Sequence, residues 1–130
     1  MIKRSVQLAM LTFVALALAV PAQAADVPYV SGGIGGAERE ELGAKERDYN
    51  VKVVTAVKSG EYLSGVMVVI ESATKQPMLE TTMAGPILMT KLPPGSYTIK
   101  ATAGGATLIR TVTTEAQVLK QVDFRWDDVR

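Results

Sequence analysis

Residues 92–99 read Leu92-Pro93-Pro94-Gly95-Ser96-Tyr97-Thr98-Ile99, and this stretch decides the fold. The two consecutive prolines lack backbone donors, so they suit the end of a strand or a turn. Gly95 can adopt the positive φ that reverses a chain, and we expect the reversal there. Tyr97 then starts a new strand, with its ring toward the core and its hydroxyl able to reach a partner at the rim. The stretch therefore predicts two strands joined by a sharp reversal.

Alternation with a period of two continues on both sides of this stretch, in short segments separated by turn residues. Gly104-Gly105 is a two-residue hairpin signal between two of these segments. Strands at spacings of about 8–12 residues are typical of a sandwich of two antiparallel sheets. We therefore predict an all-β, seven-stranded Greek-key sandwich over residues 50–126, with strands within 50–58, 66–70, 78–83, 87–92, 97–103, 108–113 and 117–126.

The part of the chain before the sandwich, residues 25–49, has a different composition. Residues 25–36 are rich in glycine and are expected to form a flexible lead-in. The glycines lack a preceding strand and the spacing of a dinucleotide-binding loop, and no Gly-Lys-Ser/Thr follows, so we interpret them as a linker rather than a phosphate cradle. Residues 37–48 are highly charged, with Leu42 as the one large apolar side chain. They predict a short, mostly solvated helix, with a helix that docks a partner as the alternative.

The first 24 residues have the three-part pattern of a secretory signal peptide. Lys3-Arg4 precedes an apolar run over residues 8–20, and Ala22-Gln23-Ala24 places small residues where signal peptidase requires them, before Ala25. A membrane-spanning helix needs about 20 apolar residues, which this run does not reach. We therefore expect Sec-dependent export to the periplasm or the medium, no membrane span after cleavage, and a short tail at residues 127–130.

The composition excludes several kinds of chemistry. The 130 residues correspond to one domain and contain no Cys and no His. Disulfides, thiolate nucleophiles, zinc sites with Cys ligands and Ser-His-Asp triads are therefore impossible. Lys plus Arg number 14 and Asp plus Glu 13, so the formal charge of +1 gives no electrostatic footprint for nucleic acid. We expect neither a cofactor nor a bound metal.

Two stretches together resemble the carboxypeptidase regulatory-like domain, a transthyretin-like Greek-key sandwich. One is Gly65-Val66-Met67-Val68-Val69-Ile70, and the other runs from Thr82 through Gly85 to residues 92–99. The resemblance covers about residues 50–114, and Leu92 to Tyr97 match the family most closely. It implies a non-enzymatic accessory module, of the kind found in small exported bacterial proteins.

The resemblance does not imply the hydroxyisourate hydrolysis of some transthyretin relatives. Those proteins use His and Arg residues and a C-terminal Tyr-Arg-Gly-Ser motif. This chain has no His and reads Trp126-Asp127-Asp128-Val129-Arg130 at its end. We also find no Ser-x-x-Lys pair, which a hydrolase of a different type would need as nucleophile and base.

Other groupings of reactive side chains have ordinary explanations. Carboxylates cluster at residues 38–41 and at residues 127–128, where we expect them to be solvated. Thioethers could hold Cu(I), but gap-filling in the core is the simpler interpretation of Met67, Met78, Met83 and Met89.

Two aromatic residues form the candidate ligand surface. Tyr62 follows a turn and Trp126 ends the last strand, so either could be exposed and stack on a sugar, although an aromatic residue at a strand end more often packs at the rim. A partner could instead add a strand at a sheet edge, for which residues 107–114 and 50–58 are candidates. The sequence thus predicts an exported, non-enzymatic binding or accessory module for an envelope protein, with a carbohydrate-binding domain as the alternative.

Overall fold

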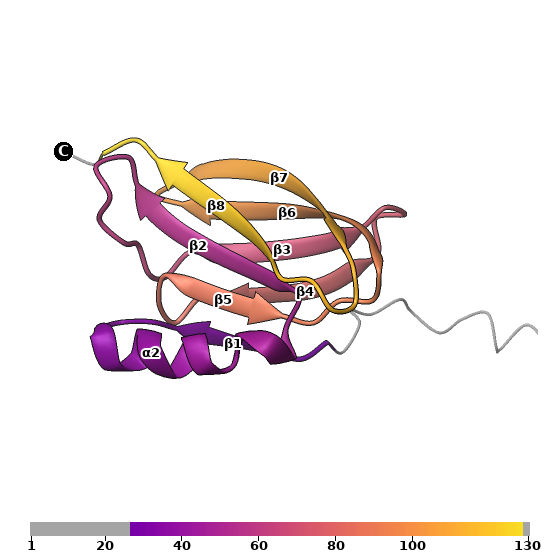
Figure 1. Cartoon of the computed structure of the whole chain (residues 1–130). Coiled ribbons are helices and arrows are strands. Elements are labelled where there is room, and N and C mark those ends of the chain that lie inside the picture. Colours follow the sequence, from indigo (N-terminus) through magenta and orange to yellow (C-terminus); the bar gives the residue numbers. More distant parts are fainter. Residues whose placement is uncertain (1–26, 129–130) are drawn as a thin grey trace, which may run out of the picture.

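The computed structural model describes residues 27–128, so the expected signal peptide and its cleavage site around Ala24 lie outside the described residues. Two four-stranded sheets face each other (Figure 1). The elements in chain order are β1 (Tyr29–Gly32), α2 (Gly36–Ala44), a 3-10 helix (Glu46–Asp48), β2 (Val51–Val57), β3 (Met67–Ser72), β4 (Pro77–Thr82), β5 (Ile87–Thr90), β6 (Gly95–Ala103), β7 (Ala106–Thr114) and β8 (Lys120–Trp126).

The first sheet has the order β1-β5-β2-β8 and the second has the order β4-β3-β6-β7. All neighbours are antiparallel except β2 and β8, which are parallel. The chain passes from one sheet to the other after β2, β4, β5 and β7. The prediction of a two-sheet, mostly antiparallel sandwich is confirmed, although there are eight strands rather than seven.

The core lies between the sheets and follows from the alternation of the strands. Val53 and Phe124 from the first sheet are fully buried, as are Val68, Ile70 and Ile99 from the second. A slip of one residue in any strand would turn these side chains to the solvent, so the apolar pattern sets the register.

The additional strand is β1, in the segment expected to be a flexible lead-in. Tyr29 to Gly32 pair with Thr90 to Ile87 of β5, so this part of the prediction is wrong. With only four residues, β1 is too short to show a clear alternation. Gly85 lies so close to it that a Cβ atom there would overlap the carbonyl group of Gly32. The absence of a side chain at position 85 therefore allows β1 to join the sheet.

The predicted charged helix is present as α2 and the 3-10 helix, and it is mostly solvated, with Leu42 as its one buried residue. Leu42 is buried against Ile87 and Met89 on the outer face of the first sheet. The Glu38 carboxylate accepts hydrogen bonds from the backbone N–H groups of Ile34, at 2.9 Å, and Gly33, at 2.5 Å, which lower the pKa of Glu38. The glycine-rich turn thus binds a carboxylate of its own chain. Within residues 27–128, no helix is long and apolar enough to cross a membrane.

Two of the three predicted turn features are confirmed. Gly104 and Gly105 have φ angles of 55° and 80° and join β6 to β7, as the hairpin signal predicted. The Tyr97 ring is buried, and its hydroxyl donates to the Pro93 carbonyl oxygen at 2.6 Å. The expectation for Gly95 is wrong, because it does not have a positive φ. It is instead the first residue of β6, paired with Thr114, so the chain turns at the prolines before it.

Candidate functional site

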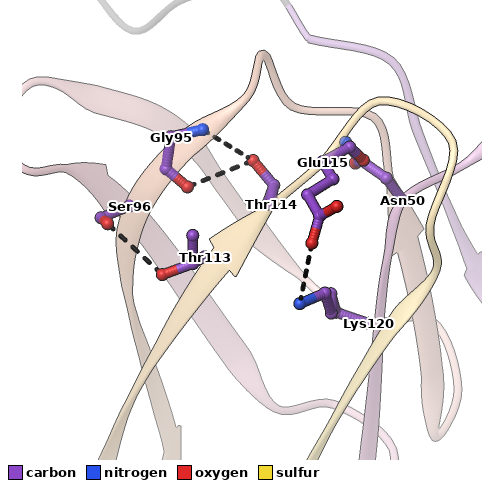
Figure 2. A network of polar contacts seen from close by, with 7 residues as sticks. All are labelled: Asn50, Gly95, Ser96, Thr113, Thr114, Glu115 and Lys120. Carbon is purple, nitrogen blue, oxygen red and sulfur yellow. Dashed lines mark hydrogen bonds and ion pairs between the residues drawn. The ribbon is translucent and has the colours of Figure 1, made fainter.

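One end of the sandwich is closed by a polar network, which we call the clamp: Asn50, Leu92, Pro93, Gly95, Tyr97 and Thr114. Figure 2 shows three of its members, Asn50, Gly95 and Thr114. Asn50 precedes β2 and is fully buried. Its Nδ2 donates to the carbonyl oxygens of Leu92, at 2.8 Å, and Glu115, at 3.2 Å. Its Oδ1 accepts the N–H of Leu92 at 2.9 Å. One amide side chain thus joins β2, the residues after β5 and the residues after β7.

Thr114 completes the clamp from the end of β7. Its Oγ1 donates to the Pro93 carbonyl oxygen at 2.9 Å and accepts the N–H of Gly95 at 3.1 Å, the second of these contacts being drawn in Figure 2. The Pro93 carbonyl therefore has two donors, because Tyr97 also reaches it. Leu92, Pro93, Pro94, Gly95 and Tyr97 thus position the backbone, and the chain itself occupies the backbone groups of Leu92, the Pro93 carbonyl, the Gly95 N–H and the Tyr97 hydroxyl.

The opposite end of the sandwich carries an open cleft of about 480 Å³, which we call the end cleft. Its lining residues come from the ends of β2 and β8, the β2–β3 loop and the hairpin that joins β6 to β7. Figure 1 shows that β2 and β8 finish at the same end of the molecule. Loops at the end of a sandwich are held by rigid sheets and are common sites of binding. The main lining residues are Lys58, Leu63, Gly104, Leu108, Arg125 and Trp126.

Trp126 lies against the end cleft but is only 6% exposed, so it packs at the rim and does not offer an exposed stacking surface. Its Nε1 donates to the Ala106 carbonyl oxygen at 3.0 Å, and its ring centroid lies 6.1 Å from that of Phe124. Trp126 belongs to the inward-facing set of β8, together with Val122 and Phe124. It anchors the hairpin and leaves only an edge to the cleft.

Tyr62 is exposed, at 53%, as the sequence suggested. The Arg39 guanidinium lies 5.3 Å from the centroid of its ring. The two residues line a shallow groove of about 240 Å³ together with Ile34 and Pro86. Ser64 lines both this groove and the end cleft, so Tyr62 and Trp126 lie at the same end of the molecule. Tyr62 does not line the end cleft and Trp126 does not line the groove, so the two rings do not form a common surface.

Charged groups at the end cleft are distributed unevenly. Lys58 Nζ lies 2.7 Å from Asp127 Oδ1, and this pair raises the pKa of Lys58 and lowers that of Asp127. Asp128 Oδ1 accepts the N–H of Ser59 at 3.0 Å, so the first two residues of the expected tail fold back onto the β2–β3 loop. Arg125 has no ion-pair partner among the residues that the structure describes. It is therefore the unpaired positive charge beside an apolar cleft.

The four methionines that could serve as copper ligands lie in different parts of the molecule. Met78 and Met83 lie in the main core, Met89 lies beneath α2, and Met67 is exposed. The fold therefore does not gather their thioethers. Within residues 27–128, no group of three or more acidic side chains is placed to hold a metal ion.

The two predicted sheet edges have different outcomes. β7, over residues 106–114, is an edge of the second sheet, as predicted. β2 is central in the first sheet, between β5 and β8, so residues 50–58 offer no free edge. Lys52 lies on the face of that sheet and binds Glu46 at 2.6 Å. Its charge is therefore paired with the 3-10 helix rather than placed at a free edge.

No protein-family model and no curated protein matches this chain. The resemblance to the carboxypeptidase regulatory-like domain therefore stays a prediction from the sequence.

Proposed function

We propose that the protein is an exported, non-enzymatic binding or accessory module of the bacterial envelope, and that it engages its ligand at the end cleft. The signal-peptide pattern in residues 1–24 supports export. The lack of His and Cys in the sequence supports binding rather than the common forms of nucleophilic or acid–base catalysis. This assignment rests on the following feature of the cleft.

The observation that carries the proposal is the pairing of an apolar cleft with one unpaired cation. Leu63, Leu108 and the edge of Trp126 provide an apolar lining, and Arg125 lies beside them without a carboxylate partner in the described residues. Binding pockets typically combine such a lining with a few polar groups that set orientation. A ligand with an apolar body and an anionic group fits this arrangement.

We also propose that the sandwich is a Greek-key member of the carboxypeptidase regulatory-like group. The passages between sheets after β2, β4, β5 and β7 support a Greek-key connection rather than a simple meander. The use of Leu92 to Tyr97 in the clamp supports a structural origin for the motif. Accessory modules of this kind have no catalytic residues of their own, which agrees with a binding role.

The mature protein, used as bait against an envelope extract, tests the cleft directly. Arg125→Glu reverses the unpaired charge, and Arg47→Glu makes the same change in the 3-10 helix, next to the clamp end. We expect one stoichiometric partner for the wild type and for Arg47→Glu, and loss of that partner for Arg125→Glu. Retention of the partner by both variants would place binding away from the end cleft.

Carbohydrate binding is the alternative function, and the exposed ring of Tyr62 favours it. A sugar could stack on this ring where Arg39 now lies over it. A glycan array with the wild type and Tyr62→Ala would test the idea, with Arg47→Glu as a control for charge and folding. Signal that is lost only in Tyr62→Ala would support this function, and an array without signal would eliminate it.

A further inference from the structure

β7 presents the free edge of the second sheet over nine residues. It pairs with β6 through a two-residue hairpin, from Ala103↔Ala106 to Gly95↔Thr114. In such a ladder the residues alternate between pairs that exchange hydrogen bonds and pairs that do not. Ala106 and every second residue after it bond to β6, so the backbone groups of Thr107, Ile109, Thr111 and Thr113 point away from the sheet.

The other three sheet edges carry features that oppose the addition of a strand. β4 begins with Pro77, and its register with β3 shifts at Ile70/Glu71. β8 presents the charged side chains of Asp123 and Arg125 on its exposed face. β1 runs against Gly85 and neighbouring residues, where the N–H of Ala84 bonds to Ser31 Oγ at 3.0 Å.

The side chains of β7 differ from those of the other edges. At the four positions with outward backbone groups they are uncharged and β-branched, and all four residues are exposed. Such residues favour an extended, paired backbone. β7 is therefore the edge, among the described strands, that is best prepared to receive another strand.

Arg110 supplies the one charge on β7. Its guanidinium lies 5.6 Å from the Phe124 ring centroid, so it points toward the gap between the sheets rather than to the outer face. Its Nη1 donates to the carbonyl oxygen of Ile109 at 3.1 Å, which occupies one of the free edge acceptors. No carboxylate pairs with Arg110 in residues 27–128. An incoming strand would thus meet an unpaired cation at the middle of the edge.

We propose that β7 binds an extended segment of a partner protein as an additional antiparallel strand, with an acidic side chain of that segment opposite Arg110. At this position the two residues form a non-hydrogen-bonded pair, in which side chains approach most closely. Leu108 and Val112 flank Arg110 on the same face and are partly buried, so they fit apolar residues two positions before and after the acidic one. We therefore expect the partner segment to have the pattern apolar–x–acidic–x–apolar, where x is any residue.

A second copy of the chain fits this edge less well than an acidic segment. In the fully paired antiparallel register, two β7 strands would place Arg110 opposite Arg110, and like charges directly opposite are destabilising. An acidic side chain of a partner strand would instead attract the Arg110 guanidinium away from the Ile109 carbonyl oxygen. That oxygen could then accept a hydrogen bond from the backbone of the partner strand. The inference goes beyond the proposed function, because Arg110 and Val112 lie outside the end cleft and Leu108 is the one contact residue shared with it.

Binding of a synthetic peptide to the full exported protein tests this inference. The probe is acetyl-Thr-Val-Thr-Glu-Thr-Val-Thr-amide, and its matched control has Lys in place of Glu. We expect the Glu peptide to protect the amides of Thr107, Ile109, Thr111 and Thr113 from hydrogen exchange while leaving Leu108, Arg110 and Val112 unchanged. We expect the Lys peptide to bind about tenfold more weakly, which corresponds to the loss of one charge pair across the strands.

Variants of the protein and the peptide separate strand addition from other binding. Arg110→Glu should reverse the preference, so that the Lys peptide binds more tightly than the Glu peptide. N-methylation of the two central Thr residues of the peptide should abolish the protection, because it removes the donors to the edge. Arg125→Glu should leave the peptide affinity unchanged, so a failure of the end cleft proposal would not affect this result.

Three results would overturn the inference. The first is no change in amide protection at about 1 mM Glu peptide, a concentration that detects even weak complexes. The second is an unchanged peptide preference in Arg110→Glu, which would show that the acidic residue does not face Arg110. The third is a concentration-dependent dimer of the free protein that protects the same four amides, which would identify a second copy as the occupant.

Discussion

The two ends of the sandwich differ in how their polar groups are satisfied. At the clamp end, the Asn50 side chain and the hydroxyls of Tyr97 and Thr114 are bonded within the chain and removed from solvent. At the cleft end, Tyr62 is exposed and Arg125 has no ion-pair partner in the described part of the chain. The polar groups of the clamp end hold the fold together, whereas those of the cleft end remain available to bind another molecule.

This difference explains why the most conspicuous motif in the sequence says little about function. A buried polar network tolerates few residue types, because each unpaired buried group costs about 1–3 kcal/mol. Leu92 to Tyr97 are therefore readable as a motif. The loops of the cleft end accept many residue types outside their turns, so a single sequence contains no clear motif for a binding site there.

Asn50→Ala should give the largest change in stability at the clamp end. The substitution leaves the N–H and the carbonyl of Leu92 without their buried partners. Two unsatisfied groups predict a loss of about 3–5 kcal/mol in the free energy of unfolding. Urea unfolding followed by circular dichroism measures this change.

Ser64→Ala is the matched control for this substitution at the cleft end. Ser64 is exposed and has no hydrogen bond from its side chain among the described contacts, so we expect a change within about 0.5 kcal/mol. Equal effects of Asn50→Ala and Ser64→Ala would show that the two ends do not differ as described.

Gly85→Ala should have the next largest effect and should act on β1. The new Cβ would overlap backbone atoms of Gly32, which cannot move without displacing the strand. Overpacking of this kind costs about 1–3 kcal/mol. Hydrogen exchange should show faster exchange in β1 and α2, with the second sheet unchanged. Gly43→Ala is the control, because a Cβ at position 43 meets no atom within 4 Å.

How far the sequence predicts this molecule depends on the length of each pattern. The strands β2, β3, β6 and β7 alternate clearly, and the Gly104-Gly105 hairpin needs two positive φ angles that glycine accepts readily. β1 could not be predicted from the sequence because four residues are too few to show an alternating pattern. Its pairing also depends on contacts with β5 and Gly85, which are distant in sequence.

The candidate site was only partly predictable for a similar reason. Tyr62 follows a turn, and its exposure could be inferred from that position. The alternation of β8 puts Trp126 on the same face as Phe124, and the structure buries that face, which leaves rim packing rather than exposure for Trp126. Leu63, Leu108 and Arg125 meet only through the packing of three separate segments, and no local pattern reveals that meeting.

Tyr97→Phe should have a smaller effect, which also depends on pH. The variant keeps the ring and removes one hydrogen bond to Pro93, whose carbonyl retains the Thr114 donor, so we expect a loss of about 1 kcal/mol. Burial raises the pKa of Tyr97, so its contribution is present below the ordinary pKa of about 10 and is lost as the pH rises through the higher folded value.

Urea unfolding of wild type and Tyr97→Phe at about pH 8 and pH 11 tests this pH dependence. The difference in stability between the two proteins should shrink, or change sign, at the higher pH. A difference that stays the same at both pH values would mean that the pKa of Tyr97 is equal in the folded and unfolded protein, so that its hydroxyl is solvated rather than part of the clamp.

The contact between Tyr62 and Arg39 should give the smallest effect, and it measures how firmly the cleft end is held. The guanidinium lies over an exposed ring, where a cation–π contact is worth about 0.5–1 kcal/mol. A double-mutant cycle with Tyr62→Leu and Arg39→Met isolates this coupling, because the separate bond from Arg39 Nη1 to Gly33 cancels in the cycle. A coupling above about 2 kcal/mol would mean that this end is as rigid as the clamp. A coupling near the expected value would leave Tyr62 free to exchange Arg39 for a ligand at little cost in stability.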